Sequence, residues 1–241
     1  MTYSTCSVVA VALLAAAAGC DRTPCDDGGV AWIEDGLPFE GDLRGVELFP
    51  GSIFHVCAST SLTSTYVYGH GGVITIEGAG IDDTMFDGLG ETRGLEILNP
   101  DGDIVVRALT VRNGASEWGD EDDADAGTYG STTGTGLFVS GTTALIDSVR
   151  LAEDSNGALL IGSDTEATIV DSEIKSNPDS GAVLAYSGST LVSQDTYWGS
   201  GDDDNDHHDV SILNSNGDLI EGYDFNGVAS FTCSWDDQVC E

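Results

Sequence analysis

The sequence predicts an all-β fold, a right-handed parallel β-helix built from coils of about 22 residues. Three observations predict it: a repeated apolar segment, a repeated order of three short strands, and asparagines that follow the strands. Apolar segments that begin at Gly136, Gly157 and Gly181 open successive repeats, at spacings of 21 and 24 residues. A period of this length is typical of solenoids, in which each repeat packs on its neighbours.

Each repeat continues with a second and a third short segment. The second segments are 144–148, 168–172 and 190–193, and the third are 149–151, 173–175 and 196–198. Strands this short cannot bury a face alone, so we expect stacked coils to form three short parallel sheets around one apolar core. Asn113, Asn156 and Asn177 follow strands, where Asn suits tight turns because it tolerates left-handed backbone angles. An ordinary β-sandwich with chance glycines and asparagines is the alternative.

The first half of the chain repeats less regularly, and residues 73–88 and 95–114 are interpreted as two earlier coils with longer turns. The phrases ITIEGAG at 74–80 and LTVRNG at 109–114 resemble coils of the pectin-lyase-like right-handed β-helix family. The resemblance covers about residues 70–215 and implies the fold. It implies no single activity, because this fold hosts lyases, hydrolases, adhesins and inert surface proteins.

The predicted organisation has four parts. They are a signal peptide at 1–19, a linker, cap and first coil at 20–69, the β-helix at 70–215 with a loop excursion at 115–135, and a C-terminal cap at 216–241. Caps are expected because an open solenoid end exposes apolar core and unpaired strand edges.

The N-terminal residues predict export. Ser7 to Gly19 is an uninterrupted run of small and apolar residues, typical of a secretory signal and too short for a permanent membrane helix. The sequence AAGC that ends at Cys20 resembles a bacterial lipoprotein signal, which implies a lipid on Cys20 and a membrane anchor in the cell envelope. Cleavage without lipidation, which would release a secreted protein, is the alternative.

Four cysteines remain outside the signal and the expected lipid site, and an even number fits an oxidising compartment. They are Cys25, Cys57, Cys233 and Cys240. Of the three possible connectivities, the most local pairs Cys25 with Cys57 and Cys233 with Cys240, which would staple each end of the chain. The sequence has no cysteine and histidine cluster at zinc-binding spacing.

The chain is strongly acidic, with 42 Asp and Glu against 7 Lys and Arg and a formal net charge of −35. Nucleic acids and other polyanions are poor partners for such a surface, because phosphate binding depends on cationic side chains. Disorder is a further alternative for an acidic chain, but 40% hydrophobic residues in Val, Ile and Leu clusters favour a packed interior.

Two acidic segments are candidate binding sites. In the excursion, Trp118 and Tyr129 could stack on a sugar, and carboxylates could bind a cation or hydroxyl groups. These carboxylates are Asp120, Asp122, Asp123 and Asp125. A solvated acidic loop is the plainer interpretation.

The second acidic segment, 202–209, follows Trp198 and Gly199 closely. Its Asp202, Asp204 and Asp206 match the first three ligand positions of a calcium loop. His207 then stands where that loop needs Gly, and Leu213 where it needs Glu. Calcium is still the one candidate cofactor, because clustered carboxylates repel one another until a hard cation neutralises them.

We predict no catalytic residue. Polygalacturonases of the resembled family use paired aspartates followed by Gly-His-Gly and a basic residue, whereas here Gly69-His70-Gly71 precedes any paired-aspartate strand. Pectate lyases need an arginine base beside calcium-binding acids, and Arg107, Arg112 and Arg150 are also explained as solubilising residues.

The sequence thus favours a non-catalytic, exported surface protein, a scaffold for adhesion or for binding a glycan or a cation. The alternatives are a polysaccharide lyase or glycoside hydrolase, and a passive surface or matrix component. An enzyme is favoured if the acids of 120–125 or 202–209 lie beside an arginine in one cleft; scattered carboxylates disfavour it.

Overall fold

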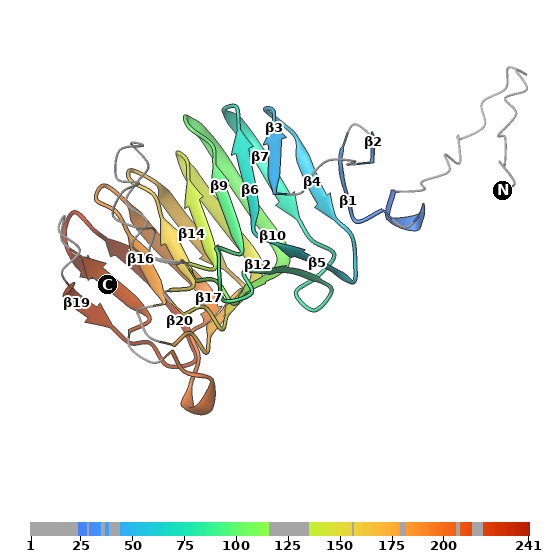
Figure 1. Cartoon of the computed structure of the whole chain (residues 1–241). Helices are drawn as coiled ribbons and strands as arrows, with labels where there is room; N and C mark the ends of the chain where they lie inside the picture. The colour runs from blue at the N-terminus through green and yellow to red at the C-terminus, as the bar shows by residue number, and fades with distance from the viewer. Residues whose placement is uncertain are drawn as a thin grey trace, which may run out of the picture.

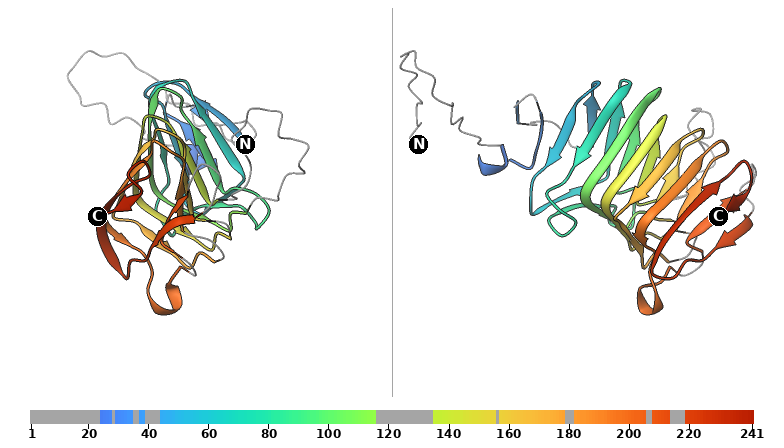
Figure 2. Two further views of the ribbon diagram at one scale, coloured as in Figure 1. Left: turned by 90° about the vertical axis from the view of Figure 1, so that its left-hand side faces the viewer. Right: turned by 180° about the vertical axis from the view of Figure 1, so that it is seen from behind.

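The computed structural model describes residues 24–27, 29–34, 37–38, 44–115, 135–155, 157–178, 182–205, 208–213 and 219–241. This part of the chain is all-β and contains, besides strands, the short 3-10 helices η1 (Pro24–Asp27) and η3 (Gly201–Asp203). Successive coils stack along one axis from the N-terminal to the C-terminal end (Figures 1 and 2). The expected signal at 1–19 and Cys20 lie outside the described residues.

Within the described residues the strands form two sheets, in which the strands of neighbouring coils run parallel. The larger sheet has 13 strands: β1 (Ala31–Ile33), β2 (Leu37–Pro38), β4 (Ile53–Val56), β5 (Thr60–Thr63), β7 (Gly72–Glu77), β8 (Thr84–Asp87), β10 (Gly102–Arg112), β12 (Thr143–Ala152), β14 (Glu166–Val170), β15 (Glu173–Lys175), β17 (Thr190–Tyr197), β20 (Val228–Ser234) and β21 (Val239–Cys240). The smaller has eight: β3 (Gly45–Leu48), β6 (Thr65–Gly69), β9 (Leu95–Leu98), β11 (Leu137–Ser140), β13 (Leu159–Ile161), β16 (Val183–Ala185), β18 (Val210–Leu213) and β19 (Leu219–Tyr223).

The register between coils follows the predicted repeat. Leu137 in β11 pairs with Leu159 in β13, and Leu159 pairs with Val183 in β16. The three apolar segments that open the repeats therefore lie side by side in consecutive coils. The parallel pairing begins earlier in the chain, where Gly45 in β3 pairs with Tyr66 in β6.

The described strands form two sheets where the sequence predicts three, because the second and third strands of each coil belong to one sheet. Within β10, Ala108 has a φ of 56°, and Ser148 occupies the same place in β12 with a φ of 55°. Val106 and Leu109 are both buried although three residues apart, so the in-and-out alternation shifts at Ala108. One left-handed residue thus turns the strand without interrupting the sheet.

The core is one continuous cluster of buried apolar side chains that runs from Ala31 in β1 to Trp235 near the last strand. A second apolar cluster lies on β11, β13 and β16 of the smaller sheet, and it comprises Phe138, Leu160 and Leu184 with partly buried Leu98 and Tyr186. These strands are apolar at nearly every position, which is typical of strands that are buried on both faces.

Antiparallel strands lie at both ends of the stacked coils. At the N-terminal end β1 pairs with β4, and at the C-terminal end β20 pairs with β17 and β19 with β18. The disulfides Cys25–Cys57 and Cys233–Cys240 confirm the most local connectivity. Each disulfide fastens one end of the described chain.

The asparagines have different roles. Asn113 has a φ of 51°, as expected for a tight turn. Asn177 instead is fully buried, and its side chain accepts a hydrogen bond from the backbone of the previous coil. Asn156 lies outside the described residues. None of the described helices is long and apolar enough to span a membrane.

Candidate functional site

A groove of about 440 Å³ crosses the third segments of successive coils on the larger sheet. Its lining includes three basic residues, Arg112, Arg150 and Lys175, and three acidic ones, Asp82, Glu153 and Asp203. The formal charge of this lining is therefore zero, in a chain with a net charge of −35. Three of the seven Lys and Arg residues of the chain lie here.

Strand register places these side chains in rows. Arg112 in β10 pairs with Ala152 in β12, which pairs with Lys175 in β15. Arg150 lies in the neighbouring row, opposite Thr110. Adjacent strands in a sheet are about 4.8 Å apart, so polar groups recur along the groove at about that spacing.

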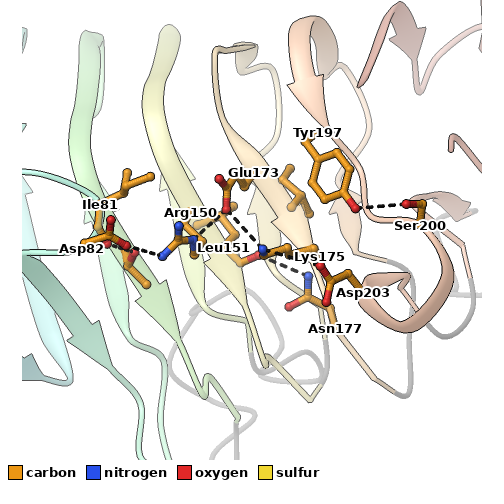
Figure 3. Close-up of polar contacts among 12 residues, drawn as sticks. Ile81, Asp82, Arg150, Leu151, Glu173, Lys175, Asn177, Tyr197, Ser200 and Asp203 are labelled. Atoms are coloured by element: carbon orange, nitrogen blue, oxygen red, sulfur yellow. Dashed lines mark hydrogen bonds and ion pairs between the residues drawn. The ribbon is translucent and has the colours of Figure 1, made fainter. Parts of the chain in front are cut away.

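Arg150 is at the centre of the groove. Its Nε donates to Glu173 Oε2 at 2.7 Å, and one terminal nitrogen donates to Asp82 Oδ1 at 2.9 Å (Figure 3). The hydrogen bond to Glu173, together with Asp82, raises the pKa of the Arg150 guanidinium. The same bond lowers the pKa of Glu173, against the opposing effect of partial burial. Both groups are therefore charged at neutral pH.

Lys175 continues the ion-pair network toward η3. Its Nζ lies 3.5 Å from Glu173 Oε2 and 3.9 Å from Asp203 Oδ2. It also lies 5.9 Å from the ring centroid of Tyr197, whose hydroxyl is 3.1 Å from Ser200 Oγ. Figure 3 shows Glu173 and Lys175 on one strand, Tyr197 on the next, and Ser200 and Asp203 beyond it.

Arg112 extends the network to the preceding coil. Its Nε donates to Asp87 Oδ2 at 3.0 Å, and a terminal nitrogen lies 3.8 Å from Glu153. Burial alone would raise the pKa of Asp87, but hydrogen bonds from Asn113, the Leu89 backbone and Arg112 lower it below its ordinary value. Each of the three groove cations thus has a carboxylate partner.

A buried polar ladder follows the third segments of the coils. The backbone N–H of Gly114 donates to Asp154 Oδ1 at 2.6 Å, that of Asp154 to Asn177 Oδ1 at 3.1 Å, and that of Asn177 to Asn205 Oδ1 at 3.2 Å. Asn205 in turn donates to Asp209 at 2.6 Å. The ladder fixes the turns that leave the groove strands.

The two carboxyl groups of this ladder are buried. Burial raises the pKa of Asp154 well above its ordinary value, and neighbouring Glu153 and Asp87 raise it further. Asp154 Oδ2 has no hydrogen-bond partner among the described residues. Burial raises the pKa of Asp209 to about 6, although Asn205 and the Phe225 backbone donate to its carboxylate.

The predicted calcium ligands are only partly described. Asp202 and Asp204 are exposed at η3 and just after it. Within the described ranges no three His, Cys, Asp or Glu side chains are arranged to hold a metal ion. The other predicted contacts lie outside the described residues: Trp118, Asp120, Asp122, Asp123, Asp125, Tyr129 and Asp206.

Calcium binding therefore stays a prediction, and a calcium titration followed by thermal melting tests it. A specific site is expected to raise the melting temperature with the concentration dependence of a binding curve. A magnesium titration at the same ionic strength controls for screening. Equal shifts with both ions would contradict a calcium-specific site.

The three arginines that could serve as a lyase base lie in different places. Arg107 pairs with Glu77 at 2.9 Å and does not line the groove, whereas Arg112 and Arg150 do. Of the second acidic segment, Asp203 shares the groove with these two arginines. An enzyme would be favoured by several acids of this segment beside an arginine in one cleft. Among the described residues, one such acid, Asp203, lines the groove.

Sequence reasoning missed Lys175, Glu173 and Asp82 as site residues. The one visible sign is a cation in the third segment of each of three consecutive coils, at Arg112, Arg150 and Lys175, and it does not by itself indicate a site. Comparison with protein-family models, with curated proteins and with solved structures finds no match to this chain.

Proposed function

We propose that the chain is a right-handed parallel β-helix, similar to the pectin-lyase-like family, that binds a neutral glycan in the groove. Consecutive parallel strands joined by crossover connections support this handedness, because such connections are right-handed in nearly all proteins. The protein is exported by residues 1–19 and held at the cell envelope through a lipid on Cys20. The intact mass of the exported protein tests the lipid.

The observation that carries the binding proposal is the gathering of cations in the groove of a strongly acidic chain. Arg112, Arg150 and Lys175 face three lining carboxylates and also contact Glu173 and Asp87, so the groove is only weakly negative and suits a neutral ligand better than a polyanion. Charged donors and acceptors that are fixed in place make strong hydrogen bonds to hydroxyl groups. A glycan carries hydroxyl groups at regular intervals, and the polar side chains of the groove also recur at a regular spacing, that of adjacent strands.

Binding is favoured over catalysis by the protonation states of the central residues. A general acid needs a raised pKa, whereas that of Glu173 is lowered by Arg150. An arginine base must lose a proton, whereas Glu173 and Asp82 raise the pKa of Arg150. Arg150 therefore suits fixed hydrogen bonding to a ligand, and Glu173 holds it in position.

Calorimetric titration with neutral xylohexaose and cellohexaose, and with anionic hexagalacturonate, tests the proposal. We expect a neutral hexasaccharide to bind and Arg150→Gln to weaken binding about tenfold, because it removes a charged donor from the groove centre. Arg107→Gln is the matched control, since Arg107 is also paired with a glutamate but lies outside the groove. Its affinity should equal that of the wild type.

Other results support the alternatives. Release of reducing ends or of unsaturated products from any of the three oligosaccharides would replace the proposal with a hydrolase or lyase, for which Asp203 beside the groove arginines is the supporting observation. Absence of binding to all three would support a passive surface component.

A further inference from the structure

A cluster of aromatic rings lies where the turn after β3 meets the end of β6, and it contains none of the groove residues. The Phe49 ring stacks on the His70 imidazole with centroids 4.8 Å apart and planes 13° apart. Tyr68 meets the same imidazole edge-on at 5.2 Å, and Glu47 Oε2 lies 3.5 Å from His70 Nε2. We name Glu47, Phe49, Tyr68 and His70 the aromatic corner.

The corner is held in place by backbone hydrogen bonds. Phe49 accepts a hydrogen bond from the Ser52 N–H at 2.9 Å, and the His70 N–H donates to Leu48 at 3.0 Å. Parallel pairing of β3 with β6 sets Glu47 opposite Tyr68. A ligand that binds here therefore meets rings that are already positioned, which reduces the entropy lost on binding.

The corner presents an apolar ring and a carboxylate to solvent together. Phe49 is 61% exposed although one face of its ring rests on His70, and the Glu47 side chain is 73% exposed. The face of an aromatic ring carries a negative quadrupole that attracts cations.

We propose that the aromatic corner is a binding site for an organic cation, an alkylammonium or guanidinium group seated on the Phe49 ring with Glu47 as its counter-ion. The net charge of −35 favours this ligand class over a neutral one, because it raises the local concentration of cations. A sugar also stacks on exposed rings but gains nothing from the charge of the chain. The site is independent of the groove.

Proton NMR titration with choline tests the proposal. The control ligand is its uncharged carbon isostere, in which a tert-butyl group replaces the trimethylammonium group. We expect choline to shift the Phe49 and His70 ring resonances to saturation, and the isostere to bind at least about threefold more weakly. Choline affinity should fall as salt is added, because the exposed charges are screened.

Two variants localise the binding. Phe49→Leu is expected to weaken choline binding at least about threefold by removing the ring face, and Glu47→Gln about twofold or more by removing the counter-ion. Val228→Ala and Glu91→Gln, at an exposed apolar and an exposed acidic residue elsewhere, should leave the affinity unchanged.

Three results would overturn the proposal. The first is equal affinity for choline and its isostere, which would show an apolar patch without charge selection. The second is wild-type choline affinity in both Phe49→Leu and Glu47→Gln. The third is a stronger response of the same ring resonances to methyl glucoside than to choline, which would assign the corner to a sugar.

Discussion

The strands of one coil present two different outer surfaces. On the smaller sheet, Phe138, Leu160 and Leu184 form an apolar cluster beyond the core, and each is no more than 4% exposed. On the third segments of the larger sheet, the corresponding surface carries the ion pairs around Arg150 and Lys175. The inner faces of both sheets pack into the same core. Packing in the core thus determines the inward-facing side chains of each strand, whereas the outward-facing side chains can be apolar on one sheet and charged on the other.

The two surfaces should also differ in what they contribute to folding. Burial of an apolar side chain contributes about 1.5–3 kcal/mol, whereas an ion pair at the surface contributes up to about 1 kcal/mol. We therefore expect the apolar surface to stabilise the fold and the charged surface to serve binding.

The largest expected effect compares two leucines that lie outside the core, one on each sheet. Leu160 is 3% exposed on β13, and Leu145 is 38% exposed on β12. Leu160→Ala should lower the free energy of unfolding by about 2–4 kcal/mol, as for other buried leucines. Leu145→Ala should cost less than about 1 kcal/mol. Urea denaturation of both variants measures the difference, and equal losses would contradict the proposed contrast.

The next effect concerns the buried ladder, where Asp154 occupies the place that Asn177 occupies one coil later. Asn177 Nδ2 donates to the Leu151 carbonyl at 3.4 Å, whereas Asp154 Oδ2 has no partner among the described residues. Asp154→Asn should keep the bond from the Gly114 N–H and supply a donor toward Asn177 Oδ1, as Asn177 Nδ2 does toward Asn205 Oδ1 at 2.9 Å. We expect about 1–2 kcal/mol of added stability at pH 7.

The sign of the pH dependence checks this expectation. Because the folded pKa of Asp154 is raised, the folded protein retains a proton that the unfolded chain releases above about 3.8, its ordinary value. Wild-type stability therefore falls as pH rises from about 3.8 toward the folded pKa. The advantage of Asp154→Asn should shrink below pH 3.8 in urea denaturation. A constant advantage at all pH values would rule out this explanation.

The repeat could be predicted from the sequence because it is local. The spacing of the apolar segments anticipates the pairing of Leu137 with Leu159. The merging of two strands into one sheet could not be predicted, because left-handed angles at Ala108 and Ser148 come from packing and not from residue preference.

The groove could not be predicted from the sequence either. Arg150 lies 23 residues from Glu173 and 68 residues from Asp82, and the three side chains meet only when the coils stack. A cation in each of three consecutive third segments was visible, but nothing local distinguishes such cations from solubilising residues. Strand register between coils is therefore the information that turns scattered charges into a candidate site.

The smallest expected effect concerns Glu173, which holds the groove residue Arg150, and it has the opposite pH dependence. The hydrogen bond from Arg150 lowers the folded pKa of Glu173, so its stabilising contribution is present above about 4.5, the ordinary value, and is lost as pH falls through the folded pKa. The Glu173 side chain is 31% exposed, and solvent screening limits the contribution to about 0.5 kcal/mol. Glu173→Gln should therefore lower stability by that amount at pH 7 and leave it unchanged below the folded pKa. Urea denaturation across this pH range measures the loss. A loss as large as that of Leu160→Ala would mean that the charged surface stabilises the fold as much as the apolar one.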